Sequence, residues 1–332
     1  MAQTPGVSIC MIVKNEAELL PRALHNWRDL GDELIVVDTG STDGTVTLAE
    51  QLGGQVYAYD WQYPGHKGAA RNMAIEQAQY EWIVMLDADE VIRTPAALRA
   101  TIIAAPRHVT GLNTTFENIA NDGSVSLRWR QLRTFRRDAY AYRHREHELP
   151  FPVVEGNQEI DCGVIFEHRP AAGRDPGKMQ PMLDRLALDV EEHPNDPHPL
   201  YFLHRQYVHA GQYELAIETG RRYLQLPGNH DRCEAFGNLA LAYDQLGQTD
   251  VAVVCLHNAL AAQPGRRVWW LRLAETYYNH GYPQHALPFL YAARAVTPAA
   301  GEQHEQPGIN DLSIIAEFIH LCEHAMGVAH VH

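Results

Sequence analysis

The sequence predicts an α/β domain with a parallel sheet, followed by an all-α domain built from helical repeats. Over residues 7–90, short apolar runs alternate with amphipathic stretches, which is the pattern of βαβ units. From residue 197 onward one residue pattern recurs at nearly constant spacing, as it does in stacked helical repeats. We therefore assign residues 1–170 to the α/β domain, residues 171–196 to a linker with a connecting helix, and residues 197–332 to the repeats.

The first 90 residues are expected to contain four strands and three helices. The strand segments are short and apolar, whereas the helical segments carry apolar residues three and four positions apart. Strands are predicted at residues 7–13, 33–37, 55–59 and 82–86, and helices at residues 16–27, 45–52 and 69–78. Further β-like runs occupy residues 111–118, 125–135 and 159–166. Ligands of parallel sheets bind at the carboxyl ends of the strands, and polar clusters follow three of these strands.

The repeat pattern consists of a Leu, a Tyr, a Gly and an Ala at the same internal spacing. It begins at Leu203, Leu239 and Leu273, which gives periods of 36 and 34 residues. The Gly allows a tight turn between two helices, and the small Ala lets these helices approach each other. Each pair leaves an apolar face that only the next pair covers, so the repeats are expected to stack. An amphipathic stretch at residues 311–324 is expected to cap the stack.

The composition is that of a folded protein, with 45% hydrophobic and 20% charged residues. No apolar run approaches the roughly 20 residues of a membrane span, and the start of the chain predicts no signal peptide. The five cysteines are scattered and lack CxxC spacing, which argues against disulfides or zinc and favours a cytoplasmic location. The net charge of −14 disfavours general nucleic-acid binding.

The acidic triplet Asp87-Ala88-Asp89 directly follows the fourth predicted strand. Two carboxylates one residue apart at a strand end can reach a divalent cation that bridges to substrate phosphates, and a diphosphate leaving group needs such charge stabilisation. Two solvated aspartates at a turn are the alternative. The GxGxxG and GK[ST] signatures of other nucleotide-binding folds are absent. In aspartyl phosphatases such a triplet follows the first strand, so its position here argues against them.

Four motifs of the sequence resemble the family 2 glycosyltransferases of the Rossmann-like GT-A fold. They occupy residues 8–16, 36–45, 69–72 and 86–90. The similarity is greater still to bacterial and phage members with a C-terminal tetratricopeptide region, which the three repeats resemble. It implies an inverting, metal-dependent hexosyltransferase that uses a nucleotide-diphosphate sugar, Mn²⁺ or Mg²⁺, and an acceptor hydroxyl or similar nucleophile. Uridine diphosphate is the commonest nucleotide of this family, so UDP-glucose is the default donor.

The resemblance assigns several residues to the nucleotide-sugar pocket. Val13, Asn15 and Glu16 would line the base and ribose pocket, and Asp38 would accept hydrogen bonds from the base. Arg71 would lie near the diphosphate. For Glu16 the alternative is an acid placed favourably at a helix N-terminus, and for Arg71 it is a solvated surface side chain.

The same resemblance assigns the metal site. Asp89 would hold the divalent cation, and Asp87 would be shared between the metal and the ribose. Ala88 would line the nucleotide sugar between them. His168 occupies a position where related enzymes place a third metal or diphosphate ligand, although a lone surface histidine is the alternative.

An inverting transferase needs a carboxylate that takes a proton from the acceptor while the sugar carbon is attacked. Residues 132–136 match an Arg-Phe-Arg strand of the family, which is followed by a His-Glu pair. Glu148 of that pair is therefore the first choice for the catalytic base. Glu146 and Asp161 are the other candidates.

Seven arginines cluster within residues 128–145. Part of their charge is expected to offset the donor diphosphate, and the rest could meet an anionic acceptor or form a solvated basic face. The acceptor could then be a phosphorylated lipid-linked saccharide or a nucleic acid. The cluster comprises Arg128, Arg130, Arg133, Arg136, Arg137, Arg143 and Arg145.

Three functions compete on this sequence. The first is an inverting glycosyltransferase whose repeats bind a protein or saccharide acceptor or form a homodimer. The second is a repeat-based interaction protein with a degenerate transferase domain, against which the intact acidic residues argue. The third is a phage-type DNA-base glycosyltransferase, which the arginine cluster favours and the net charge disfavours.

Overall fold

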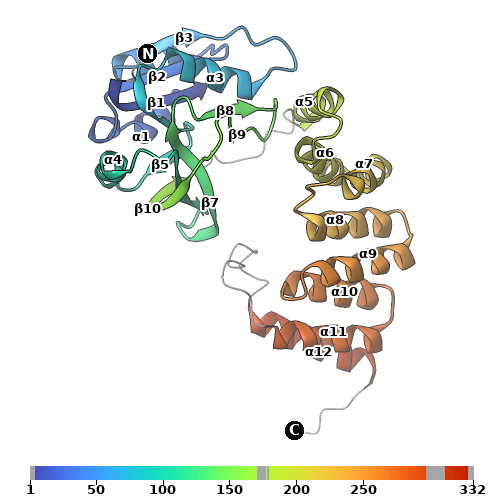
Figure 1. Ribbon diagram of the computed structural model, residues 1–332. Coiled ribbons are helices and arrows are strands. Elements are labelled where there is room, and N and C mark those ends of the chain that lie inside the picture. The colour runs from blue at the N-terminus through green and yellow to red at the C-terminus, as the bar shows by residue number, and fades with distance from the viewer. Residues whose placement is uncertain (1–3, 170–176, 178, 297–310, 328–332) are drawn as a thin grey trace. The chain divides into compact units, whose positions relative to one another are not determined.

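The computed structural model describes residues 4–169, 177, 179–296 and 311–327 (Figure 1). The chain forms two compact units, Met1–Arg185 and Leu186–His332. The boundary between them falls within helix α5 (Met179–Glu192), inside the segment that the sequence assigned to a linker with a connecting helix. Residues 171–176 of that segment lie outside the described residues.

The first unit is built on an eight-stranded sheet (Figure 1), and a separate antiparallel pair of strands follows its seventh strand in sequence. Its strand order is β3–β2–β1–β4–β7–β6–β10–β5. The strands of the large sheet are β1 (Thr4–Val13), β2 (Glu33–Asp38), β3 (Gln55–Ala58), β4 (Tyr80–Met85), β5 (Glu90–Ile92), β6 (Gly111–Ile119), β7 (Val125–Arg136) and β10 (Glu159–His168). The separate pair consists of β8 (Tyr140–Arg143) and β9 (Leu149–Pro152).

The sheet is parallel in its first half and mixed in its second. Strands β3, β2, β1 and β4 pair in parallel, as the alternating pattern of the first 90 residues predicts. Strand β7 runs antiparallel to β6 because a short turn joins the two, and it also pairs with β4 in antiparallel orientation. In that turn Gly123 adopts φ 84°, a left-handed conformation that glycine enters at little cost.

One predicted helix of the first unit is wrong. In place of a helix over residues 16–27 the chain forms α1 (Leu20–Ala23) and the 3-10 helix η1 (Trp27–Asp29). Pro21 lacks the N–H that would bond to the carbonyl of Ala17, so a continuous helix loses one bond of its ladder. The remaining helices of the sheet domain are α2 (Thr45–Gln51), α3 (Lys67–Gln77) and α4 (Pro95–Ala104).

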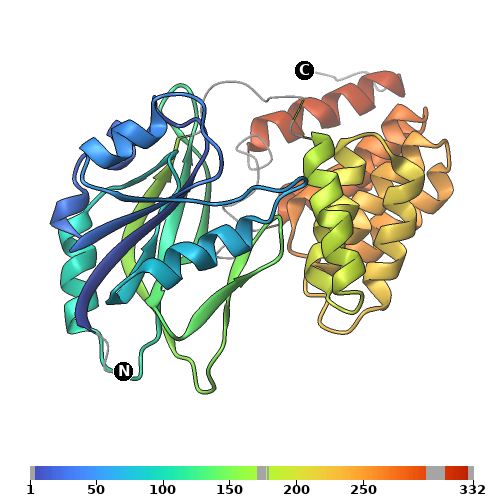
Figure 2. The same cartoon turned by 90° about the horizontal axis from the view of Figure 1, so that it is seen from above.

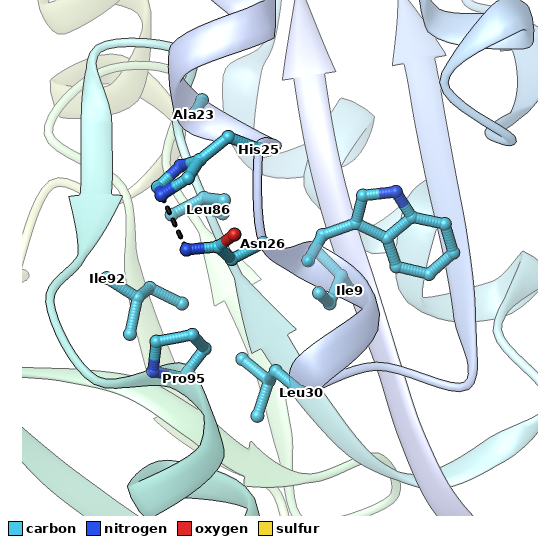
Figure 3. Close-up of a pocket in the computed structure, with 9 residues that line it drawn as sticks. Ile9, Ala23, His25, Asn26, Leu30, Leu86, Ile92 and Pro95 are labelled. Atoms are coloured by element: carbon cyan, nitrogen blue, oxygen red, sulfur yellow. Dashed lines mark hydrogen bonds between the residues drawn. The ribbon is translucent and has the colours of Figure 1, made fainter.

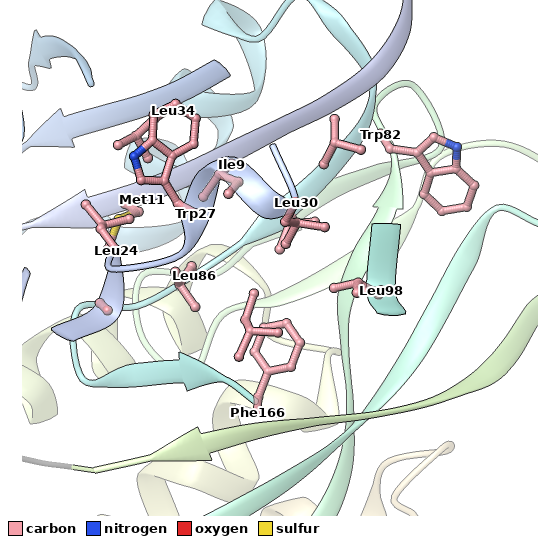
Figure 4. Packing of buried hydrophobic residues seen from close by; sticks show 14 of the residues in the cluster. Ile9, Met11, Leu24, Trp27, Leu30, Leu34, Trp82, Leu86, Leu98 and Phe166 are labelled. Atoms are coloured by element: carbon pink, nitrogen blue, oxygen red, sulfur yellow. The ribbon is translucent and has the colours of Figure 1, made fainter. Parts of the chain in front are cut away.

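Two hydrophobic clusters cover opposite faces of the sheet. Ile9 and Met11 of β1 pack with residues of α1, η1 and α4 on one face (Figure 4). Cys10, between them in sequence, points to the other face and packs against α3. Alternate residues of a strand point to opposite faces, so a strand buried on both sides needs an unbroken apolar run. Figure 2 shows this sheet domain from a second direction.

The second unit is a series of antiparallel helix pairs. Gly211, Gly247 and Gly281 each adopt a left-handed conformation, with φ between 70° and 82°, at the turn within a pair. The predicted repeat therefore corresponds to the helical pairs, and the last helix packs on the one before it. The helices are α6 (Pro197–His209), α7 (Tyr213–Gln225), α8 (Arg232–Gln245), α9 (Thr249–Ala262), α10 (Arg267–Asn279), α11 (Pro283–Ala295) and α12 (Leu312–Ala325). Among the described helices of the chain, none is long and apolar enough to cross a membrane.

Candidate active site

The polar residues predicted for the site emerge at one edge of the parallel half-sheet. Val13 lies opposite Asp38 at the ends of β1 and β2. On the other side of β1, Cys10 pairs with Met85 near the end of β4. Asp87 follows β4 by two residues and so leaves the sheet at the same edge, where ligands of parallel sheets bind.

The loops after β1 and β2 are tied together by hydrogen bonds. The Asn15 N–H donates to Ser41 Oγ at 2.9 Å, and the Thr42 N–H donates to Asn15 Oδ1 at 2.7 Å. Asn15 adopts φ 56°, a conformation that asparagine tolerates better than most residues. The Val13 carbonyl accepts from the Thr39 N–H at 2.9 Å. The loop after β1, which is predicted to line the base pocket, is thus held in place by hydrogen bonds to the loop after β2.

Asp38 and Glu16, both predicted for the nucleotide pocket, are hydrogen-bonded within these loops. Asp38 is 8% exposed and accepts hydrogen bonds from the N–H groups of Gly40 and Ser41. A carboxylate offers about four lone-pair positions, so Asp38 keeps acceptor capacity for a base, and that contact stays a prediction. The Glu16 N–H donates to Thr45 Oγ1 at 2.8 Å at the start of α2. Both interpretations of Glu16, as a pocket residue and as an acid at a helix terminus, stay predictions.

The centre of the site is a buried network of ion pairs around Asp87. Asp87 Oδ1 lies 2.8 Å from Arg71 Nη2, and Arg71 Nε donates to Glu148 Oε1 at 2.8 Å. The side chains of Arg71 and Glu148 are only 6% and 8% exposed. The network therefore joins α3, the loop after β4 and the loop before β9. The solvated arginine considered as the alternative for Arg71 is wrong.

Two further residues complete this network. Arg133 Nη2 lies 2.8 Å from Asp87 Oδ2 and 2.5 Å from Glu90 Oε1. The Asp87 N–H donates to Glu90 Oε2 at 3.0 Å. Glu90 was not among the residues predicted for the site, and Arg133 was predicted only as part of the arginine cluster. Both belong to motifs that carry the family resemblance, and this is the signal that could have identified them.

Burial and charge shift the pKa values of the network in different directions. Burial lowers the pKa of Arg71, but the carboxylates of Asp87 and Glu148 raise it well above its usual value. Burial raises the pKa of Asp87, but Arg71 and Arg133 hold it well below its usual range. Burial raises the pKa of Glu90 to about 7 in spite of Arg133. Asp87 is therefore a firmly ionised carboxylate between two guanidinium groups.

The two arginines are not fully satisfied by these bonds. Arg71 Nη1 and Arg133 Nε are buried and have no hydrogen-bond partner among the described residues. A buried donor without a partner is costly, and native structures contain few of them. Such donors are consistent with a site that rearranges to take an anionic ligand.

The three predicted metal ligands do not form one cluster. Asp89 Oδ2 lies 3.1 Å from His168 Nε2, and His168 Nδ1 lies 2.8 Å from Asn118 Oδ1. Asp87 instead directs both oxygens to the arginines. Within the described ranges no group of three His, Cys, Asp or Glu side chains is arranged to hold a metal ion. The hydrogen bond to Asp89 raises the pKa of His168 above its usual value, although burial opposes the shift.

The three candidates for the base occupy different environments. Glu148 lies on Arg71 in the network described above. Glu146 is 4% exposed and pairs with both Lys67 and Arg185. Burial raises the pKa of Glu146, but these two cations bring it below its usual value. Asp161 is half-exposed on β10 and pairs with an arginine of β7 at 2.8 Å. Glu148 is bonded to Arg71, which also binds Asp87 of the acidic triplet.

The arginine cluster is largely neutralised by carboxylates. Arg128 lies 2.5 Å from Glu117, and Arg130 lies 2.8 Å from Asp161. Arg133 binds within the central network, and Arg136 pairs with Glu81. Four of the seven arginines are therefore ion-paired, so the free basic face considered for an anionic acceptor does not form at these four. At these four positions the cluster does not supply the unpaired charge that favoured the DNA-modifying alternative.

A small pocket lies beside the strands but not at this site (Figure 3). Its walls include Ile9, Leu30, Leu86 and Ile92, and its volume is about 10 Å³. That is room for about one water molecule, whereas sites for small-molecule ligands occupy roughly 300–1,000 Å³. The pocket is therefore a packing defect next to the apolar cluster.

Comparison with known sequences identifies the family. Residues 8–153 match the model of glycosyl transferase family 2. A TPR repeat-containing protein of Synechococcus elongatus is 52% identical over 313 residues, which cover 88% of this chain and 75% of the relative. An uncharacterized glycosyltransferase of Rickettsia felis is 42% identical over 85 residues, 25% of this chain and 29% of that protein. The glycosyltransferase SunS of Bacillus phage SPbeta is 32% identical over 96 residues, 21% of its length.

Among solved structures, one similar chain is MamA. It has 18% sequence identity and a TM-score of 0.39, and the match covers 46% of this chain and 81% of that one.

Proposed function

Because the chain belongs to glycosyl transferase family 2 and joins this domain to tetratricopeptide repeats, we propose that it transfers a sugar from a nucleotide-diphosphate sugar to an acceptor hydroxyl or similar nucleophile. One observation carries the proposal. Arg71 links Asp87 of the acidic triplet to Glu148 in a single buried network at the carboxyl edge of the sheet. The residue proposed to contact the donor and the carboxylate proposed as the base thus belong to one network, which supports a displacement reaction.

In the proposed reaction Glu148 takes the proton of the acceptor hydroxyl. The acceptor oxygen then forms a bond to the anomeric carbon from the face opposite the nucleotide. The bond from that carbon to the diphosphate breaks, and the nucleoside diphosphate leaves with the bonding electrons. Configuration at the carbon is inverted, and no covalent enzyme intermediate forms. Arg71 Nε holds Glu148 at 2.8 Å and fixes its direction.

Asp89 and His168 are proposed to hold a divalent cation, Mn²⁺ or Mg²⁺. The amide nitrogen of Asn118 donates to Ser126 Oγ. The amide oxygen of Asn118 therefore faces His168 Nδ1 and accepts a hydrogen bond from it. In neutral His168 the Nε2 lone pair then faces Asp89 Oδ2 at 3.1 Å, and two acceptors at this distance need a proton or a cation between them. A carboxylate with an oriented imidazole fits such a metal. The cation would stabilise the negative charge of the departing diphosphate.

The donor pocket is proposed to lie over the tied loops after β1 and β2. Asp38 accepts from the base, and Val13, Asn15 and Glu16 line the base and ribose. Asp87 and Ala88 contact the remainder of the donor near Arg71. The buried nitrogen of Arg71 without a partner supports an anionic group here, and UDP-glucose is the first donor to test.

The repeats are proposed to bind the acceptor, either a protein or a saccharide, or a second copy of the chain. Stacked repeats present an extended surface that suits such contacts.

A hydrolysis screen tests the proposal. UDP-, dTDP- and GDP-sugars are incubated with the wild type, with and without Mn²⁺, and release of the nucleoside diphosphate is measured. We expect one donor to be hydrolysed in the presence of Mn²⁺ and Asp89→Ala to lower its turnover by about 10²-fold or more. Equal turnover of the two proteins would exclude Asp89 as a metal ligand. If calorimetry with Mn²⁺ detects no binding of any of these nucleotides, the interaction-protein alternative is favoured instead.

A further inference from the structure

Glu146 is a buried carboxylate that the proposed reaction does not use. It is 4% exposed, and its Oε2 accepts from Arg185 Nε at 2.6 Å and lies 2.6 Å from Arg185 Nη2. Its Oε1 accepts from Lys67 Nζ. Two cations therefore converge on one carboxylate two residues before Glu148.

Arg185 connects this carboxylate to a second loop. Its Nη1 donates to the carbonyl of Pro64 at 2.9 Å, in the loop that leads into α3. Arg185 is the last residue of the first compact unit and lies on α5, outside residues 8–153 that match the family model. One guanidinium thus bonds to the loop before Arg71 and to the loop before Glu148.

The loop that carries Glu148 adopts a backbone that must be held from outside. His144 and His147 have φ values of 68° and 52°, the left-handed region that non-glycine residues rarely occupy. Such conformations persist where surrounding contacts over-determine them. The Gly68 N–H donates to the His144 carbonyl at 3.2 Å, and the Lys67 N–H donates to the Arg145 carbonyl at the same distance.

The backbone of residues 144 and 145 packs closely against the start of α3 at Gly68. A Cβ added to Gly68 would lie 2.5 Å from the His144 carbonyl oxygen. Residues 144–148 therefore contact the start of α3 through their backbone and α5 through the side chain of Glu146.

We propose that Arg185 is a positioning residue, which acts through Glu146 to hold residues 144–148 so that Glu148 stays on Arg71. The inference rests on the proposed function, in which Glu148 is the base. It extends the catalytic unit to α5 and reassigns Glu146 from a candidate base to the residue that links Arg185 to the loop. A displacement of about 1 Å in a reacting group can reduce a rate by about 10²-fold, so the effect falls on catalysis and not on donor binding.

The test compares Arg185→Gln with Arg185→Lys and the wild type as full-length chains. With the donor hydrolysed in the screen, we expect Arg185→Gln to lower kcat about 10- to 100-fold while KM for the donor changes less than about twofold. Arg185→Lys keeps a positive charge beside the carboxylate of Glu146, so its kcat should be close to that of the wild type. Amide hydrogen exchange in residues 144–148 should be at least about tenfold faster in Arg185→Gln than in the wild type.

Arg99→Gln is the matched control. Arg99 also joins a carboxylate, Asp32, to a backbone carbonyl, that of Leu30, but away from the site. We expect it to change neither kcat nor exchange in residues 144–148. Unchanged exchange in Arg185→Gln, or faster exchange with an unchanged kcat, would overturn the proposal. If the wild type hydrolyses none of the donors, the proposed function fails, whereas the exchange measurement still decides whether Arg185 holds the loop.

Discussion

The two units of this chain bury different kinds of side chain at their key positions. The first unit buries Arg71, Arg133, Glu90 and Glu146 within ion-pair networks. In the second unit the key repeat positions are small or apolar, such as Ala252 at 1% exposure.

The first unit is thus organised around charged groups, and the second around the packing of small and apolar side chains. Buried ion pairs add little net stability compared with apolar residues of the same volume, whereas stacked repeats are stabilised by the interfaces between neighbours. The charges of the first unit are therefore best explained by the proposed reaction. Substitutions in the two units should then differ in what they change.

The largest expected effect is on activity. Glu148→Gln keeps the size of the side chain and an oxygen that can accept from Arg71, but it removes the carboxylate that we propose as the base. We expect kcat for donor hydrolysis to fall about 10²- to 10⁴-fold with little change in the melting temperature. Asp161→Asn, at the half-exposed alternative carboxylate, is the control and should stay within about twofold of the wild type. If kcat fell in Asp161→Asn and not in Glu148→Gln, Asp161 would be the better candidate for the base.

An intermediate effect is expected on both activity and stability. Arg71→Met leaves the buried carboxylate of Glu148 without Arg71 and leaves Asp87 with Arg133. Removing one partner of a buried ion pair costs about 3–5 kcal/mol of unfolding free energy, which denaturant titration measures. We expect donor hydrolysis to be lost as well, even at temperatures where the variant is folded. A variant of unchanged stability would show that the network is more solvated than the structure indicates.

The smallest effect is expected in the repeats and on stability alone. Gly247 adopts φ 73° in the turn between α8 and α9, a conformation that costs a residue with a Cβ about 1–2 kcal/mol. Gly247→Ala should lower the unfolding free energy of its unit by this amount and leave the hydrolysis rate of the first unit unchanged. Gly247→Asn should lower it less, since asparagine tolerates this region. A reduced hydrolysis rate in Gly247→Ala would contradict the separation of roles.

The contrast also explains how far the sequence predicted each unit. The helical pairs were predicted because their contacts are local and repeat the same residues at a fixed spacing, as Gly211, Gly247 and Gly281 do. In the first unit the same reasoning predicted the parallel strands but not the break at Pro21, since apolar spacing alone does not reveal a missing hydrogen-bond donor.

The site depends on residues that are distant in sequence. Arg71 and Glu148 are 77 positions apart, and Arg133 and Asp87 are 46 apart. The motifs identified Arg71, Asp87 and Glu148 one at a time, and their roles in donor binding and catalysis stay predictions. Their joining into one network, with Arg133 and Glu90, was not predictable from spacing.

The sequence alone determined the order of the two units, the parallel strands, the repeat and the residues at the strand ends, because periodicity and turn chemistry act over short distances. Only the tertiary structure decided which charges meet. It turned Asp87 toward two arginines, paired Asp89 with His168, neutralised four arginines of the cluster and brought Arg185 to Glu146. The physical reason is that a buried charge is tolerated only beside its partner, and the folded chain, not the spacing of the sequence, brings those partners together.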